Sequence, residues 1–400
     1  MSTIKIHINT ISVLKELLCL YNLLQAHGEV KLVGGCVRDM LLGLAPKDID
    51  LATTILPQEV MKILSPNQIK CIPTGLEFGT VTAVVNHIIF EITTLRKDIK
   101  TYGRKAEVEF TDEWLEDAKR RDFTVNAMYA SIDGTVMDFF NGIEDLKNKK
   151  IKFIGNAEQR IKEDFLRILR YFRFISYIGG NSIDENSLMA AIKLKSGLEK
   201  ISGERIKTEM FKLLSNPFAK KSIQLFKKTG IDQYICMPEV YDLPELNFII
   251  GNATVNLTLI LKALKISAVE LNGLFKRWRL STLEKKELAF LREYQYPWPL
   301  NAEIKLHQRE FYRLGAYFKN AILVKASTEE QYTLAEELIL ASTTWHYPDF
   351  PLKGEDLIKL GAIGPKVGQI KNLLLETWIE NDFLYDKDKL LDIATKISLK

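Results

Sequence analysis

The stretch GGCVRDMLLG (34–43), followed three residues later by KDIDLATT (47–54), decides the fold of this chain. The residues that lead into it, VKLVGG (30–35), predict a short buried strand that runs into a glycine turn. The residues after the turn predict a helix, and the second half of the stretch predicts another strand. Because side chains alternate along a strand, we expect Asp48 and Asp50 to lie on the same face.

The segments around this stretch extend an α/β pattern to about residue 135. Amphipathic spacing predicts a helix over 11–27, and a proline opens a second predicted helix over 57–64. Two β-branched runs within 79–95 are joined through Asn86 and predict a hairpin. From about residue 157 onward, apolar residues recur mostly with helical spacing. The prediction is an α+β protein, with an N-terminal head of mixed sheet and helices followed by an all-helical remainder.

Composition sets further bounds on the chain. Its 400 residues exceed one typical domain, and its net charge of +4 permits an anionic partner without proving one. The four cysteines form no CxxC pair, which argues against a zinc site or a dithiol motif and fits a reducing compartment. No apolar run reaches the ~18–20 residues of a membrane span, and the N-terminus lacks the pattern of a signal peptide. We therefore expect a cytoplasmic protein with no membrane partner.

Asp48 and Asp50 carry the first chemical prediction. Carboxylate oxygens suit Mg²⁺, and two such ions close together are a common device for displacement at phosphorus. The glycine pair, Gly34 and Gly35, stands directly before a predicted helix, where backbone N–H groups can bind phosphate. Each feature alone also fits a solvated carboxylate pair and an ordinary turn. The sequence contains neither a P-loop nor a dinucleotide-binding glycine pattern at this place.

Ordered spacing favours the functional interpretation, because Arg38, Asp39 and Gly43 fall between the glycines and the carboxylates. The whole stretch resembles the signature of the class II tRNA nucleotidyltransferases and bacterial poly(A) polymerases, within the DNA polymerase β superfamily. One departure is Phe165, where bacterial members usually have proline, and we expect it to affect the start of a helix. The resemblance covers residues 32–214, about half the chain, and four further motifs carry it in the same order: RRDFTVNAM (120–128), DFFNGIEDL (138–146), EDFLRILRYFRF (163–174) and GERIKTEMFKLL (203–214).

The resemblance implies three regions in the chain. These are a polymerase β-like nucleotidyltransferase head over 1–138, a helical neck with the base-recognition motif over 139–215, and a helical body and tail that bind tRNA over 216–400. It also implies nucleotidyl transfer with Mg²⁺ as cofactor and with tRNA, CTP and ATP as partners. Asp48 and Asp50 match the catalytic aspartates that hold the metal. The matching nucleotide contacts are Gly35, Arg38 and Arg121.

A row of charged residues recurs every three positions along a predicted helix: Asp164, Arg167, Arg170 and Arg173. Cytosine and adenine each present an amino donor beside a ring-nitrogen acceptor, whereas uracil and guanine reverse this pattern. A carboxylate only accepts and a guanidinium only donates, so Asp164 with Arg167 would satisfy C or A and reject U or G. This matches the roles of both positions in the similar family. Arg170 and Arg173 are then triphosphate contacts or helix anchors, and we assign all four to nucleotide binding; an exposed row of acid–base pairs is the alternative.

Three further segments bear on the reaction. Glu91 lies on the strand after the predicted turn, and polymerase β-like heads commonly take a third acidic ligand from a neighbouring strand; a plain strand-edge glutamate is the alternative. The charged segment 95–111 resembles the flexible loop that CCA-adding enzymes use when they switch from C to A, although an ordinary solvated loop fits as well. The region 71–85 contains no Arg or Lys, unlike the basic leader of bacterial poly(A) polymerases, so CCA addition is favoured.

The tail holds one more motif, LGAIGPKVG (360–368), which predicts two helices joined by a glycine turn. In the similar family this region grips the tRNA, and backbone contacts of this kind would position RNA without reading its sequence. A plain turn between helices is the alternative. No His-Asp dipeptide occurs, so we expect no metal phosphohydrolase activity.

The sequence therefore predicts a template-independent enzyme that adds CCA to the 3′ end of tRNA. The nearest alternatives are a bacterial poly(A) polymerase and an enzyme that adds only CC or only A. A catalytically silent RNA-binding protein is the non-enzymatic alternative, and the intact pair Asp48 and Asp50 argues against it. Both a monomer and a homodimer fit the sequence.

Overall fold

The computed structural model describes residues 4–102, 105–180, 182–238 and 246–398. The chain divides into two compact units, the first made of Met1–Leu243 with Ile266–Leu280 and the second of Pro244–Lys265 with Ser281–Lys400. Among the described helices, none is long and apolar enough to cross a membrane. Every site residue predicted from the sequence belongs to the first unit.

A seven-stranded sheet forms the framework of the head, in the order β3-β4-β5-β2-β1-β8-β9. β2 and β5 run parallel, whereas the other neighbouring pairs run antiparallel, so the predicted mixed sheet is confirmed. The strands are β1 (Val30–Val33), β2 (Ile49–Thr53), β3 (Lys70–Gly75), β4 (Thr80–Val85), β5 (Ile88–Thr94), β8 (Met128–Ala130) and β9 (Val136–Asp138).

The centre of the sheet brings the glycine turn and the carboxylates together. β1 pairs antiparallel with β2, so the end of β1 lies beside the start of β2. Gly34 follows β1 with a φ of +71°, a conformation that glycine adopts without strain, and α2 (Gly35–Leu41) starts from it. On its other side β2 pairs parallel with β5, which places Glu91 opposite Asp50.

The local predictions around the sheet hold. β4 and β5 pair antiparallel and turn at Asn86 and His87, whose φ values are +48° and +68°. Positive φ at both central residues is what a tight two-residue hairpin turn requires. The second predicted helix begins at Pro57, as expected for a residue that has no N–H to leave unpaired.

The charged segment 95–111 forms a second hairpin, whereas the family resemblance predicts a flexible loop and the alternative interpretation an ordinary solvated loop. Lys97 and Glu109 lie opposite each other, with 3.1 Å between Nζ and Oε2. Opposite charges that face each other across two strands stabilise a hairpin. In the sequence the same residues form only a charged run, which is also typical of a solvated loop. Residues 103–104 of this segment lie outside the described part of the chain. The two antiparallel strands are β6 (Arg96–Tyr102) and β7 (Lys105–Phe110).

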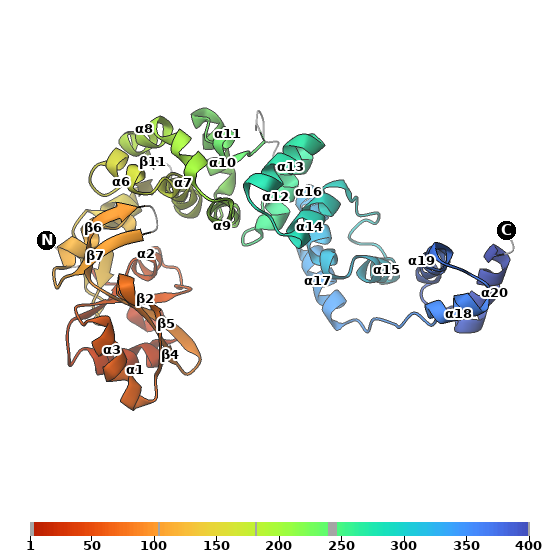
Figure 1. Ribbon diagram of the computed structural model, residues 1–400, viewed down its shortest axis with the longest axis horizontal. Helices are drawn as coiled ribbons and strands as arrows, with labels where there is room; N and C mark the ends of the chain where they lie inside the picture. Colours follow the sequence, from red (N-terminus) through yellow and green to blue (C-terminus); the bar gives the residue numbers. More distant parts are fainter. Residues whose placement is uncertain (1–3, 103–104, 181, 239–245, 399–400) are drawn as a thin grey trace. The chain divides into compact units, whose positions relative to one another are not determined.

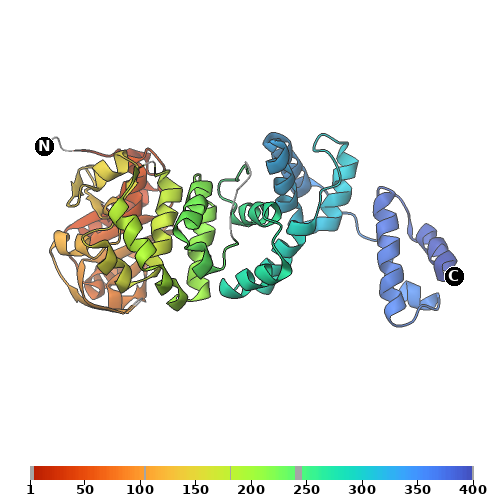
Figure 2. The same cartoon turned by 90° about the horizontal axis from the view of Figure 1, so that it is seen from above.

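Helices cover the sheet and build the neck of the first unit. α1 packs against α3, and α2 contacts β1, β2 and β8 (Figure 1). α7 is the central helix of the neck, because α9 and α10 both pack against it (Figure 2). The remaining described α-helices of this unit and a parallel strand pair are α1 (Leu14–Leu24), α3 (Pro57–Leu64), α4 (Trp114–Lys119), α5 (Gly142–Lys147), α6 (Ala157–Glu163), α7 (Leu166–Ile178), α8 (Glu185–Lys193), α9 (Gly203–Leu214), α10 (Ala219–Thr229), α11 (Asp232–Ile235), α13 (Ala268–Arg277), β10 (Lys150–Ile151) and β11 (Ser182–Ile183).

A break between α6 and α7 corrects one prediction about the charged row. Asp164 has an extended backbone, with φ −153° and ψ 109°, and α7 begins only at Leu166. The three arginines of the row lie on α7 as predicted, but Asp164 precedes the helix instead of lying on it. Its carboxylate accepts the N–H of Leu166 at 3.1 Å and so satisfies a donor at the helix start.

Phe165, the departure from the family pattern, fills the space beside this break. Its φ of −63° is the value that proline would impose, so the substitution keeps the backbone of the helix start. Its ring lies against Gly197, where an added Cβ would come within 2.0 Å of a ring atom. The ring therefore holds the chain next to Asp164 in place by packing.

The second unit is helical, as predicted for this part of the chain. Phe311 and Phe318 lie in one core, and Trp378 lies in a smaller core of the tail. The predicted turn between helices is confirmed, with positive φ at Gly361 and Gly364. The described α-helices are α12 (Ala253–Ala263), α14 (Thr282–Glu293), α15 (Ile304–Leu314), α16 (Phe318–Glu329), α17 (Tyr332–Thr344), α18 (Gly354–Lys359), α19 (Pro365–Glu380) and α20 (Lys387–Ser398).

We predict that Gly197→Ala destabilises the protein, because the new methyl group overlaps the Phe165 ring. The expected loss is ~1–3 kcal/mol of unfolding free energy, typical of overpacking, measured by urea denaturation. Gly273→Ala is the matched control, since Gly273 lies inside α13 with no atom within 4 Å of its added Cβ. That control should be neutral or stabilising by up to ~1 kcal/mol. Equal effects of the two substitutions would contradict the packing argument.

Candidate active site

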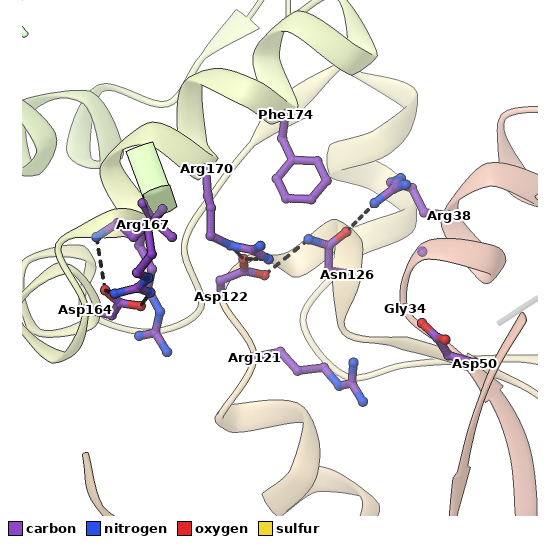
Figure 3. Close-up of a pocket in the computed structure, with 13 residues that line it drawn as sticks. Gly34, Arg38, Asp50, Arg121, Asp122, Asn126, Asp164, Arg167, Arg170 and Phe174 are labelled. Carbon is purple, nitrogen blue, oxygen red and sulfur yellow. Dashed lines mark hydrogen bonds and ion pairs between the residues drawn. The ribbon is translucent and has the colours of Figure 1, made fainter. Parts of the chain in front are cut away.

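A cavity of about 450 Å³ lies in the first unit, where the glycine turn, the segment after α4 and the start of α7 meet (Figure 3). Its lining is mostly charged, which suits an anionic ligand better than an apolar one. The lining residues are Gly34, Gly35, Arg38, Asp50, Arg121, Asp122, Asn126, Asp164, Leu166, Arg167, Arg170, Phe174 and Arg205.

A side chain at the first position of the glycine turn would be in tight contact with its neighbours. A Cβ on Gly34 would come within 3.3 Å of Nη1 of Arg121 and 3.5 Å of the carbonyl oxygen of Asn126. Gly35 faces Arg38, whose Nη2 would lie 3.8 Å from an added Cβ. The backbone of the turn therefore stays open to the cavity and lies between two guanidinium groups.

The three predicted acidic residues form a cluster of like charges beside this turn. Asp50 is partly buried, and Asp48 and Glu91 are exposed. Burial first, and then the negative charges of Glu91 and Asp48, raise the pKa of Asp50 to about 6, against a lowering by Arg121. The cluster offers only oxygen donors, which suits a hard divalent cation that would offset this repulsion.

In the described part of the chain, no three His, Cys, Asp or Glu side chains gather closely enough to make a complete metal site. Mg²⁺ sites in nucleotide-handling proteins commonly use one or two carboxylates and take their other ligands from water and substrate phosphate. The pair Asp48 and Asp50 fits a cation that is completed in this way.

A chain of hydrogen bonds crosses the cavity from the head to the neck (Figure 3). Arg38 donates through Nη1 to the Asn126 side-chain oxygen at 2.7 Å, and Asn126 donates to Asp122 at 3.1 Å. Arg170 donates through Nε to the other oxygen of Asp122 at 2.7 Å. Burial alone would raise the pKa of Asp122, but Arg170 and the Asn126 hydrogen bond lower it to about 2. This chain of hydrogen bonds, the Asp122 relay, holds two predicted nucleotide contacts, Arg38 and Arg170, in fixed positions.

Sequence analysis missed Asp122 and Asn126, although both stand inside the motif RRDFTVNAM. Their signal was available, because both residues are polar while Phe123, Val125, Ala127 and Met128 beside them are apolar. Such residues are buried only with partners. What the sequence does not give is the identity of those partners, which come from α2 and α7.

Asp164 is held by a residue that the sequence analysis did not single out. Arg205, from α9, donates to both oxygens of the Asp164 carboxylate, at 2.6 and 3.2 Å. Arg167 donates through Nη1 to the backbone oxygen of Arg160 at 2.8 Å and to Glu163 at 2.5 Å. The two predicted base contacts thus line one cavity and are each fixed by a neighbour.

Arg173 lies apart from the other members of the row. Its Nε donates to Glu209 of α9 at 2.5 Å, and its guanidinium lies 4.1 Å from the centre of the Phe174 ring. It does not line the cavity described above. Of the two roles predicted for Arg173, these contacts favour the anchoring of α7 over contact with a triphosphate.

Comparisons with known proteins identify the family to which the chain belongs. Residues 30–152 match the family model of the poly A polymerase head domain, and residues 181–243 match that of a probable RNA and SrmB-binding site of polymerase A. The chain is 36% identical over 386 residues to CCA tRNA nucleotidyltransferase 1, mitochondrial, of Mus musculus, covering 92% of this chain and 87% of that one. The chain belongs to the CCA tRNA nucleotidyltransferase family.

Two further members of this family are similar over most of their length. The CCA-adding enzyme of Lactobacillus helveticus is 30% identical over 385 residues, which cover 92% of this chain and 94% of that protein. The crystal structure of Bacillus stearothermophilus CCA-adding enzyme in complex with CTP superimposes with a TM-score of 0.79 at 26% identity, over 97% and 98% of the two chains. The family, the fold class and the enzyme class predicted from the sequence are confirmed.

The lowered pKa of Asp122 predicts how the unfolding free energy of the protein depends on pH. A carboxylate whose pKa falls from 3.8 to about 2 on folding stabilises the protein above about pH 4. That contribution, roughly 2 kcal/mol, is lost as the pH falls from about 4 towards 2.

We expect the gap in unfolding free energy between wild type and Asp122→Asn, measured by urea denaturation, to be largest near pH 7 and to shrink below pH 4. Asp112→Asn, at an exposed carboxylate, is the control and should open little gap at either pH; a gap for Asp122→Asn that does not change with pH would refute the prediction.

Proposed function

We propose that the protein adds C, C and A in turn to the 3′ end of tRNA, using CTP twice and ATP once and releasing pyrophosphate each time. One observation carries the proposal: a single cavity holds the glycine turn, Asp50 of the carboxylate strand and the pair Asp164 and Arg167. Phosphate, metal and base would thus be held at one place. The names of the similar enzymes favour CCA addition over poly(A) addition.

For the metal, we propose that Asp48 and Asp50 bind Mg²⁺, with Glu91 as a third acidic group opposite Asp50. The bound ion would lower the pKa of the attacking 3′ hydroxyl and offset the charge of the triphosphate. The surroundings of Asp50 support this assignment, because its carboxylate is partly buried and has the negative charges of Glu91 and Asp48 beside it, which a cation would offset.

For the triphosphate, the proposed contacts are the backbone at Gly35 and the guanidinium groups of Arg38, Arg121 and Arg170. Guanidinium groups match phosphate oxygens in geometry and charge, and a fixed guanidinium loses little entropy when it binds. The relay through Asp122 keeps Arg38 and Arg170 fixed before the nucleotide arrives. The 3′ oxygen of tRNA then forms a bond to the α-phosphorus, and the bond from that phosphorus to pyrophosphate breaks.

For the base, we propose that Asp164 accepts the amino group of cytosine or adenine while Arg167 donates to the ring nitrogen. Uracil and guanine would set a carbonyl against the carboxylate and an N–H against the guanidinium. Each such mispairing of buried polar groups costs ~1–3 kcal/mol. Because Arg205 holds both oxygens of Asp164, the carboxylate cannot easily turn away to tolerate the wrong base.

For the RNA, we propose that the neck and the glycine turn of the tail contact tRNA through its backbone. The family match of residues 181–243 supports this for the neck, and the two positive-φ glycines, Gly361 and Gly364, support it for the tail. The β6–β7 hairpin is the proposed element for the switch from C to A. The cytoplasmic location predicted from the cysteines stays a prediction, since the mouse relative is named a mitochondrial enzyme.

Product length tests the proposal. tRNA transcripts that lack CCA, that end in CC, or that carry full CCA are incubated with Mg²⁺, CTP and ATP, and the products are resolved at single-nucleotide length. We expect three, one and no added nucleotides, and we expect Asp50→Asn to lower the rate by more than about a hundredfold. A long A tail would show a poly(A) polymerase, and an unchanged rate for Asp50→Asn would sink the metal assignment.

Base selection gives a second test. Asp164→Asn keeps an acceptor for the start of α7 but adds a donor, so we expect the preference for CTP over UTP, as a ratio of kcat/KM values, to fall by about tenfold or more. Asn156→Ala removes the cap of the preceding helix, α6, and is the matched control. It should leave the ratio unchanged. If both variants keep the wild-type ratio, Asp164 does not read the base.

A further inference from the structure

Asp117 on α4 lies outside the cavity lining and has no part in the proposed chemistry, yet its carboxylate accepts hydrogen bonds from four residues. Its side chain is 1% exposed. Oδ1 accepts from Nε of Arg120 at 2.8 Å and from the backbone N–H of Arg96 at 3.3 Å. Oδ2 accepts from the hydroxyl of Tyr129 at 2.6 Å and from Nη2 of Arg121 at 3.1 Å. A buried carboxylate with this many hydrogen-bond partners is held in one position, and it restricts the position of each partner.

The contacts of Asp117 divide the Arg121 guanidinium into two edges. Nε and Nη2 face Asp117 at 3.3 and 3.1 Å, and Nε also donates to the Tyr129 hydroxyl at 3.2 Å. Nη1 lies on the other edge, 3.3 Å from the place that a Cβ on Gly34 would occupy. Figure 3 draws this guanidinium at the cavity, near Asp50 and the glycine turn. One edge is therefore held by the protein while the other faces the site.

Charge explains why this arrangement needs an ionised carboxylate. Burial alone would lower the pKa of Arg121, but Asp117 and Tyr129 reverse the effect and raise its pKa. Burial alone would likewise raise the pKa of Asp117, but Arg121 and Arg120 bring it to about 2. Each charge is tolerated in the interior because the other is present. An amide in place of Asp117 would keep the shape and remove the charge.

Asp117 also ties the catalytic sheet to the hairpin. Asp117 accepts the N–H of Arg96, the first residue of β6, and only Leu95 separates Arg96 from the end of β5, the strand of Glu91. The same carboxylate therefore fixes Arg121 and the base of the β6–β7 hairpin relative to one another.

We propose that Asp117 is the positioning residue for Arg121, and that it aims Nη1 at the triphosphate of the incoming CTP or ATP. The inference rests on the proposed function, in which Arg121 binds the triphosphate. It goes further because it names Asp117 as the group that holds the Arg121 guanidinium in position for this contact. Because the triphosphate is common to both substrates, loss of Asp117 should weaken CTP and ATP alike, without changing the choice of base.

A double-mutant cycle on the full-length enzyme tests this. The constants kcat and KM are measured for CTP with tRNA lacking CCA and for ATP with tRNA ending in CC, for wild type, Asp117→Asn, Arg121→Ala and the double variant. We expect Asp117→Asn to raise both KM values by about tenfold, the effect of losing one charge-assisted hydrogen bond, with a smaller change in kcat. In the Arg121→Ala background it should raise KM no further, since the group that it positions is gone.

Asp138→Asn is the matched structural control. Asp138 is a half-buried carboxylate of the head that accepts the backbone N–H groups of Gly142 and Ile143, at 2.9 Å each, and it lies outside the cavity. Its substitution should lower the melting temperature and leave both KM values unchanged. If Asp117→Asn does not fold, Tyr129→Phe replaces it, because the Tyr129 hydroxyl joins Asp117 to Arg121. This variant should raise both KM values by a smaller factor, about threefold.

The outcomes distinguish a failure of the binding role proposed for Arg121 from a failure of the positioning role proposed for Asp117. If Arg121→Ala leaves KM unchanged, Arg121 does not bind the triphosphate, and both its proposed role and the inference fail. If Arg121→Ala raises KM and Asp117→Asn raises it independently and additively, the proposed role of Arg121 holds and the positioning role of Asp117 is refuted. A loss of thermal stability with unchanged KM values would also refute it.

Discussion

The antiparallel pairing of β1 with β2 is the constraint on which the rest of the site depends. It sets the end of one strand, where Gly34 turns into α2, beside the start of the other, where Asp50 stands. The parallel partner β5 then brings Glu91 to the same level of the sheet. The glycine turn, Asp50 and Glu91 are thus neighbours because of the backbone hydrogen bonds between the strands. No side chain has to be ordered to bring them together.

The cavity concentrates positive charge, and carboxylates in its lining and beside it stabilise that charge. Asp122 holds Arg170, Asp117 holds Arg121, and Glu163 holds Arg167. Pairing of this kind is favourable only where burial is offset by good geometry. The arginines are consequently in position before a nucleotide binds, so that binding costs little side-chain entropy. Positive groups then face the cavity from fixed positions.

The break before α7 shapes one side of the cavity. Because Asp164 stands in an extended backbone rather than on the helix, its carboxylate accepts from the start of α7 and meets Arg205 of α9 at once. The packing of Phe165 against Gly197 supports the same break from the other side. The base selection proposed for Asp164 and Arg167 would thus depend on a helix start, a neighbouring helix and an apolar contact. In that proposal the protein itself presents the complementary donors and acceptors, in place of a template strand.

The sequence by itself determined the family, the α+β class, the glycine turn, the carboxylate strand and the arginines of α7, because these depend on short-range patterns and ordered motifs. It did not determine that 95–111 forms a hairpin, since cross-strand charge pairs are invisible to a linear pattern. Nor did it give the partners Asp117, Asp122 and Arg205, or separate Arg173 from the cavity. Those facts come from elements far apart in the chain that pack together, and only the tertiary structure decides which buried charge meets which.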